Sequence, residues 1–321
     1  MKRWLLILLG LAALAAAGAY SALWTSAGPE EGPHTLVVEQ GATLTKVAEQ
    51  LDAIGAIPGN PTTFRAMARL FGSSDPVQAG EFLIPKGASA SETLDLLQHG
   101  RPIQRLVTIP EGMPSILVHE RLMAVPYLTG AIPVPREGSV LPDSYSYQRG
   151  ESRSEVLKRM QAAMTRELDA LWAKRQPHAV VDTKAEAITL ASIVEKETAK
   201  PAERRMVAGV YSNRLEKGMP LQADPTVIYP ITKGKPLGRR IRQSELDAVN
   251  DYNTYAMAGL PAGPIANPGR LSIAAVLNPV RTEALYFVAD GTGGHIFANT
   301  LAQHNANVAK WYAIRRARGE M

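Results

Sequence analysis

Two glutamates stand two positions apart near the end of an apolar segment, and their placement predicts different surroundings for each. Residues 185–198 have the pattern of a helix. At about 100° per residue, one face of this helix is an apolar arc made of Ala187, Leu190, Ala191, Ile193 and Val194. Glu197 falls inside that arc and Glu195 near its edge. Glu197 is therefore the carboxyl expected to lie against apolar side chains.

A carboxyl held in apolar surroundings loses solvation of its charged form, so its pKa rises. Such a group can keep a proton near neutral pH and donate it to the leaving oxygen of a glycosidic bond, which contributes about 10²- to 10⁴-fold to the rate. We therefore predict Glu197 as a general acid. The alternative is a structural glutamate satisfied by a partner on its own helix or by an ion pair, for example with Arg204 or Arg205.

Polar residues in loop-like stretches are candidates for binding the hydroxyl and N-acetyl groups of a sugar or for orienting the acid. Binding residues gather in such loops, although each of these side chains could equally cap a helix or close a turn. Asp224 precedes Pro225, a pair that often only opens a turn. The candidates are Glu195, Gln222, Asp224, Thr226, Asn253, Thr254, Tyr255 and His295.

No cofactor and no metal is expected. The chain has six His, no Cys and no HExxH motif, so it lacks the usual zinc ligand patterns. The glycine-rich residues 290–294 join two strand-like runs, whereas a phosphate-binding loop joins a strand to a helix. We interpret them as a hairpin turn. His295, which follows this turn, either reaches the site or simply continues the strand.

A string of motifs resembles the endolytic murein transglycosylase family, also called MltG or YceG-like. The resemblance covers nearly all of the chain after its first apolar segment. The motifs are residues 191–197 (ASIVEKE), 213–215 (NRL), 221–229 (LQADPTVIY), 252–255 (YNTY), 259–261 (GLP), 264–269 (PIANPG), 286–295 (YFVADGTGGH) and 304–305 (HN).

This resemblance implies a lyase that cleaves peptidoglycan strands internally, between N-acetylmuramic acid and N-acetylglucosamine. It places Glu197 in the catalytic position, as the acid and then the base, and implies 1,6-anhydromuramyl ends. Two alternatives remain open. One is a hydrolytic muramidase that uses Glu195 or Asp224 as a second carboxylate. The other is a wall-binding scaffold in which Glu197 is structural.

The predicted fold class is α+β, with a transmembrane helix, a LysM-like α+β module and a catalytic domain that mixes helices with a small antiparallel sheet. Three runs of strand, Gly turn and helix predict the module. We expect a cytoplasmic tip at residues 1–3, a transmembrane helix at 4–24, a linker at 25–34, the module at 35–135 and the catalytic domain at 136–321.

Residues 4–24 carry no charge and are long enough to cross a bilayer. Lys2 and Arg3 precede them, so the positive-inside rule places the N-terminus in the cytoplasm and the catalytic domain in the periplasm, on the inner membrane. A cleaved signal peptide is the alternative. The expected partners are the membrane and peptidoglycan, and the resemblance suggests peptidoglycan synthases. The net charge of +5 is spread out, which argues against nucleic-acid binding.

Overall fold

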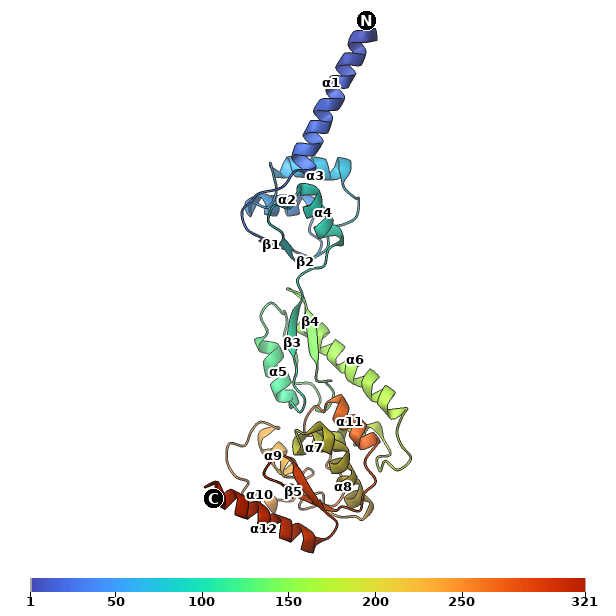
Figure 1. Cartoon of the computed structure of the whole chain (residues 1–321), viewed down its shortest axis with the longest axis vertical. Helices are drawn as coiled ribbons and strands as arrows, with labels where there is room; N and C mark the ends of the chain where they lie inside the picture. Colours follow the sequence, from blue (N-terminus) through green and yellow to red (C-terminus); the bar gives the residue numbers. More distant parts are fainter. Residues whose placement is uncertain (1, 321) are drawn as a thin grey trace. The chain divides into compact units, whose positions relative to one another are not determined.

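The structure is a computed structural model that describes residues 2–320, and its helices and short strands confirm the mixed α+β class (Figure 1). The chain divides into two compact units. The first unit comprises Met1–Arg105 and Ser146–Glu151, and the second Leu106–Tyr145 and Ser152–Met321. Met1, part of the predicted cytoplasmic tip, lies outside the described residues.

The first unit begins with an apolar helix and continues with a two-stranded sheet and three helices. Its elements are α1 (Lys2–Tyr20), the π-helix η1 (Ser21–Thr25), β1 (His34–Val38), α2 (Leu44–Ala53), α3 (Pro61–Phe71), β2 (Gly80–Ile84) and α4 (Ala90–His99). Strands β1 and β2 are antiparallel, with His34 opposite Ile84 and Val38 opposite Gly80. The inward side chains of this sheet and of the helices form one core around Phe64 and Phe82.

Helix α3 is the element that the strand, turn and helix pattern misses. It begins with Asn60, whose Oδ1 accepts a hydrogen bond from the Thr63 amide at 3.0 Å, followed by Pro61 in the first turn. An Asn cap followed by Pro is a helix start signal in its own right. The motif from β1 to β2 is therefore strand, helix, helix, strand.

The apolar N-terminal segment does not end where the module begins. Residues Ile7–Thr25 are long and apolar enough to cross a membrane, yet Trp24, within that stretch, is 4% exposed and belongs to the core of the first unit. Its ring lies 6.3 Å from that of Phe64. Within the predicted linker at residues 25–34, the amide of Gly28 donates a hydrogen bond to the carbonyl of Gly87 at 3.0 Å. These contacts bind the segment to the module instead of leaving it free.

Strands β3 (Arg105–Thr108) and β4 (Ser144–Tyr147) pair as a two-stranded sheet. The chain passes from one unit to the other within each of these strands, after Arg105 and after Tyr145. The predicted boundary at residue 135 lies some thirty positions after Arg105. The reason is that the third predicted strand, turn and helix run is packed within the second unit. There Asn267 donates a side-chain hydrogen bond to the carbonyl of Met113 at 2.9 Å, just before the helix of that run.

The second unit is mainly helical. Its further elements are α5 (Ser115–Ala124), α6 (Arg153–Trp172), α7 (Lys184–Glu197), the 3₁₀ turn η2 (Pro201–Glu203), α8 (Arg204–Glu216), α9 (Asp224–Thr232), α10 (Gln243–Leu246), α11 (Arg270–Leu277), β5 (Tyr286–Ala289), β6 (His295–Ala298) and α12 (Leu301–Ala317). Strands β5 and β6 are antiparallel and joined by residues 290–294, which confirms the predicted hairpin turn.

Helix α7 is the central helix of the second unit. It packs against α8 and α11, and its residues from Ala187 to Val194 are buried on every side. Gly209 in α8 allows a close approach, since a Cβ there would lie 2.4 Å from the carbonyl oxygen of Val280. The core fixes α7, so any side chain at its end has a defined position.

Candidate active site at the end of helix α7

Helix α7 begins with a capping box. The Thr183 hydroxyl accepts a hydrogen bond from the Glu186 amide at 3.1 Å, and the Glu186 carboxylate accepts one from the Thr183 amide at 3.0 Å. In its middle, the Ser192 hydroxyl accepts from the Ile265 amide at 3.0 Å, which fastens the loop before α11 to the helix. Glu197 is the last helical residue, and the chain turns to an extended conformation at Thr198.

Glu197 is shielded from solvent, as its position in the apolar arc predicts. Its Oε1 is shielded from solvent and has no hydrogen-bond partner among the residues that the structure describes. Burial raises the pKa of the Glu197 carboxyl to about 7, and the nearby Asp224 carboxylate adds to this. The hydroxyl of Tyr211 and the guanidinium of Arg214 act in the opposite direction on this pKa. The carboxyl is thus poised to gain or lose a proton near neutrality.

Two side chains from α8 form the polar part of these surroundings. Tyr211 is 2% exposed, and burial together with Glu197 raises the pKa of its hydroxyl well above the ordinary value. Arg214 is 8% exposed and donates to the carbonyls of Leu285 at 2.7 Å and Leu221 at 2.8 Å. These bonds fix the guanidinium, so its positive charge stays where it favours an ionised Glu197.

The start of α9 supplies the neighbouring carboxylate. Asp224 is exposed, and its Oδ1 accepts a hydrogen bond from the Tyr255 hydroxyl at 2.6 Å. Burial, followed by this bond and the charges of Asp224 and Glu197, raises the pKa of Tyr255. The predicted candidates Asp224 and Tyr255 thus form a pair that is electrostatically coupled to Glu197.

Glu195, two residues earlier, has a different role. Its side chain is 5% exposed, and its carboxylate accepts from the Arg204 guanidinium at 3.0 Å and from the Gly269 amide at 2.9 Å. Arg204 also pairs with Glu111 at 2.8 Å. Both oxygens of Glu195 are therefore occupied, and the side chain joins α7, α8 and the loop before α11.

The alternative in which Glu197 is neutralised by an arginine is not supported. Arg204 pairs with Glu195 and Glu111, and Arg205 bonds the backbone and side-chain oxygens of Asn278. Neither arginine forms an ion pair with Glu197 within residues 2–320.

Three of the predicted loop candidates are fully buried and bonded within the protein. The hydroxyls of Thr226 and Thr254 lie 2.8 Å apart, and the Ala223 amide donates to Thr254 at 3.1 Å. Asn253 donates to three backbone carbonyls, those of Glu245, Leu246 and Ala248. These three side chains hold the loops around α9 in place.

Gln222 is exposed and stands at the edge of the site. Its backbone has a φ of 55°, in the left-handed region that few non-glycine residues adopt. Its Oε1 accepts from Arg214 at 3.3 Å, and its amide bonds the carbonyl of Thr254 at 3.0 Å. Of the loop candidates, Gln222, Asp224 and Tyr255 are the ones with side chains linked to the surroundings of Glu197.

His295 reaches the end of α7 through another carboxylate. Its Nδ1 lies 2.8 Å from Glu203 Oε2, and its amide donates to Glu203 Oε1 at 3.1 Å. The Thr198 hydroxyl donates to Glu203 at 3.2 Å. These contacts connect the β5–β6 hairpin to the residue that follows Glu197.

The sequence reasoning did not select Tyr211, Arg214 or Glu203. Arg214 stood within the quoted motif at residues 213–215, and Tyr211 lies one helical turn before it on α8. That spacing puts both on one side of the helix, which is the signal that a helical projection of α8 offers. Glu203 carries no comparable signal in the sequence.

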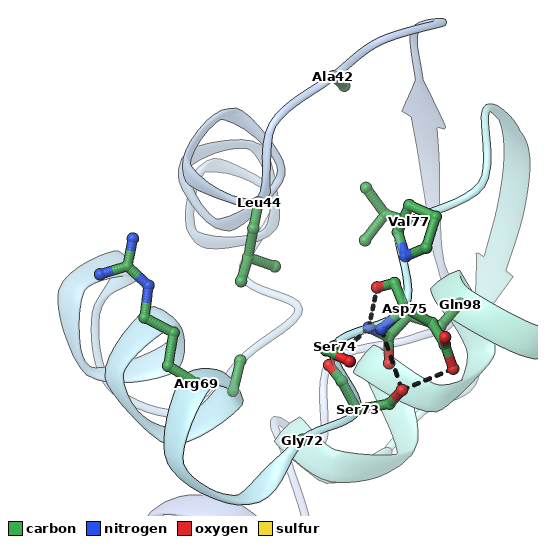
Figure 2. A pocket seen from close by; sticks show the side chains of 11 residues that line it. Ala42, Leu44, Arg69, Gly72, Ser73, Ser74, Asp75, Val77 and Gln98 are labelled. Atoms are coloured by element: carbon green, nitrogen blue, oxygen red, sulfur yellow. Dashed lines mark hydrogen bonds between the residues drawn. The ribbon is translucent and has the colours of Figure 1, made fainter.

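The first unit contains a separate pocket of about 440 Å³ between the β1–α2 turn and the segment that joins α3 to β2. Figure 2 shows Leu44 and Arg69 on one side of it and Asp75, Val77 and Gln98 on the other. The segment is held by Gln98, which donates to the carbonyl of Ser73 at 3.1 Å. The wall is mixed, with aliphatic, hydroxyl, amide and charged groups.

Fold and site together define a protein with a small α+β module and a helical unit whose central helix ends at a shielded carboxyl with a raised pKa. The chain belongs to the YceG-like family, which matches residues 36–310. Two curated relatives are named endolytic murein transglycosylase. The Bacillus subtilis protein is 35% identical over 182 residues, which cover 56% of this chain and 49% of that relative. The Streptococcus pneumoniae protein (strain D39) is 27% identical over 325 residues, covering 86% of this chain and 58% of the relative.

The chain thus spans about half the length of the curated relatives it matches. A crystal structure of a YceG-like protein from Listeria monocytogenes has the same fold, with a TM-score of 0.52. It is 24% identical, and the match covers 86% of this chain and 99% of the Listeria chain.

Proposed function

We propose that this chain is an endolytic murein transglycosylase with Glu197 as its single acid and base. The observation that carries the proposal is the shielded carboxyl at the end of α7, whose pKa of about 7 allows it to hold a proton at neutral pH and also to lose it. The names of the two relatives support murein as the substrate and glycosyl transfer as the reaction. The bond between N-acetylmuramic acid and N-acetylglucosamine is the one that the family resemblance implies.

In the first step, the Glu197 carboxyl donates its proton to the oxygen that joins C1 of N-acetylmuramic acid to the next sugar. The C1–O bond breaks, the N-acetylglucosamine end leaves as an alcohol, and positive charge develops at C1. Glu197 is then a carboxylate. Tyr211 and Arg214 stabilise this form, because both lower the pKa of the Glu197 carboxyl.

In the second step, the C6 hydroxyl of the same muramic acid attacks C1, and Glu197 takes its proton. A bond between O6 and C1 forms, the 1,6-anhydro ring closes, and Glu197 is protonated again for the next cycle. No water is consumed, so one carboxyl is sufficient.

The surroundings of the other carboxylates favour this mechanism over hydrolysis. Glu195 has both oxygens bonded to Arg204 and Gly269, which leaves it no free oxygen to activate water. Asp224 remains a candidate base for a muramidase, because it is exposed and close enough to influence the pKa of Glu197.

We also propose that α1 anchors the protein in the inner membrane as a single pass, with the N-terminus in the cytoplasm and the chain from β1 onward in the periplasm. The length and composition of Ile7–Thr25 support the anchor. We further propose that the first unit is a LysM-like module that holds glycan in the pocket between Leu44 and Val77. Its strand, helix, helix, strand order supports this. Peptidoglycan synthases are the proposed partners.

The test uses full-length protein in detergent on uncrosslinked glycan strands, with the ends of the products identified by mass. We expect anhydromuramyl ends from the parent protein and from a Glu216→Gln control, since Glu216 is exposed at the end of α8. Glu197→Gln should give none. Reducing muramyl ends would instead indicate a muramidase, and binding without cleavage by either form would indicate a scaffold.

A further inference from the structure

A second cavity, of about 980 Å³, lies in the second unit beside the first half of α7. Its volume is at the upper end of the range of about 300 to 1,000 Å³ that small-molecule sites occupy. Ile188 and Thr189 of α7 line it, and none of the residues coupled to Glu197 does. The cavity is therefore separate from the surroundings of the acid, on the same helix.

Two tyrosines form an aromatic wall of this cavity. Tyr229 comes from α9 and Tyr252 from the loop before Tyr255, and their ring centroids lie 4.9 Å apart at an angle of 42°. The Tyr229 hydroxyl donates to the Glu137 carboxylate, which also accepts from the Ser115 amide at 2.8 Å. Burial raises the pKa of the Glu137 carboxyl. Glu137 is partly buried and itself lines the cavity, so its carboxylate is part of the wall beside the tyrosines.

The other wall residues offer both neutral polar and charged groups, the charged ones being Arg136, Glu137, Asp169 and Lys184. Gln161 and Thr165 come from α6, and Thr189 from α7. The cation of Lys184 is paired with Asp169 at 2.6 Å, so these two charges offset each other at the rim. Aromatic faces combined with hydroxyl and amide groups suit a sugar ring, which has an apolar C–H face and polar edges.

Three elements contribute both to this cavity and to the site at Glu197. Helix α7 gives Thr189 to the cavity and ends at Glu197, eight residues further on, a rise of about 12 Å. Helix α9 begins with Asp224 and continues to Tyr229, and the loop that carries Tyr252 also carries Tyr255. The cavity therefore lies at a fixed offset from the acid, longer than one sugar ring and within reach of an oligosaccharide.

We infer that the cavity is a remote glycan subsite, in which Tyr229 and Tyr252 bind an N-acetylated sugar of the same strand that Glu197 cleaves. This inference rests on the proposed function. Binding energy gained at such a distance can position the strand for the chemical step, so substrates too short to reach the cavity react more slowly. The subsite would select strands that extend beyond the scissile bond in one direction.

The first experiment compares full-length variants on long uncrosslinked strands and on short muropeptide oligomers. Tyr252→Ala removes an aromatic face, and Thr165→Trp fills the cavity from its exposed rim without removing a core side chain. For both, we expect the ratio of kcat/KM on long strands to that on short oligomers to fall about tenfold. Tyr312→Ala, an exposed tyrosine of α12, is the matched control and should keep the parent ratio.

A second experiment measures binding of soluble N-acetylglucosamine oligomers to the Glu197→Gln protein by calorimetry, with and without Thr165→Trp. Weaker binding in the filled variant supports the subsite even if no cleavage is ever observed, in which case only the proposed function fails. The inference is overturned if cleavage by the parent is normal and the filled variant changes neither the ratio nor the binding. An equal loss on long and short substrates would also overturn it, because it would indicate a structural role.

Discussion

The surroundings of Glu195 and Glu197 show how two equal side chains on one helix acquire opposite properties. Glu195 has a guanidinium and a backbone amide on its two oxygens. Glu197 has an oxygen without any partner in the described part of the chain, next to the buried ring of Tyr211. The first arrangement stabilises a charged carboxylate, and the second raises the pKa of the carboxyl to about 7, so that acid and carboxylate are both populated near neutrality.

This difference shows that burial alone does not give a carboxyl the raised pKa that a general acid needs. Both carboxyls are shielded, but a buried charge with a full set of hydrogen bonds is structural, whereas one that lacks them keeps its proton. The two residues lie about 200° apart around α7, since each step turns about 100°. One therefore faces Arg204 and the loop before α11, and the other faces α8 and the start of α9.

The largest expected effect comes from removing the free acid. Glu197→Gln keeps the size of the side chain but cannot transfer a proton, so we expect kcat to fall by at least about 10²- to 10⁴-fold. The circular dichroism spectrum should stay that of the parent. Cleavage within tenfold of the parent rate would contradict the assignment of Glu197.

Removing the paired carboxylate should instead lower stability. Glu195→Gln leaves Arg204 with a single carboxylate partner and breaks a shielded ion pair, which should cost about 2 to 3 kcal/mol of unfolding free energy. Thermal unfolding in detergent measures this. If Glu195→Gln abolished activity while the melting temperature stayed constant, Glu195 would have a chemical role and the comparison would fail.

The pH dependence follows from the raised pKa of Glu197. The acid must be protonated to begin the reaction, so kcat/KM should fall about tenfold per unit as pH rises above about 7. For stability, the folded pKa of about 7 exceeds the ordinary 4.5, so the folded protein binds the proton more tightly. The free energy of unfolding of the parent should therefore decrease as pH rises from 4.5 to 7. Above pH 7, Glu197→Gln should exceed the parent in unfolding free energy by up to about 3 kcal/mol.

The smallest expected effect comes from the neighbouring carboxylate. Asp224 raises the pKa of Glu197, so Asp224→Asn should move the fall of kcat/KM to lower pH. The shift should be a fraction of a unit, because Asp224 is exposed and burial is the main cause. A much larger loss of rate at every pH, with reducing ends among the remaining products, would indicate that Asp224 acts as a hydrolytic base.

Short sequence patterns predicted several features of this site. Thr183 and Glu186 mark the start of α7, and the helical projection places Glu197 on the buried side of the helix, where its Oε1 is shielded from solvent. Residues 290–294 form the hairpin turn that their flanking strands predict. Each of these features depends on residues close together in the sequence.

Features that depend on distant segments could not be predicted in this way. Thr226, Asn253 and Thr254 look like surface loop residues by type, and only the fold shows that they are fully buried and bonded to neighbouring backbone. The contacts between Arg204 and Glu111 and between His295 and Glu203 join residues about ninety positions apart. The unit boundary at Arg105 depends in the same way on Asn267 reaching back to Met113.

The burial of Trp24 has a mechanical consequence. The apolar helix continues through η1 into the core of the first unit, and Tyr20 packs on Phe71 with ring centroids 4.7 Å apart. Because no slack chain separates helix and module, a tilt or rotation of one is transmitted to the other. Where α1 crosses a bilayer, the thickness of the surrounding lipid would therefore set the angle at which the module's pocket stands above the surface.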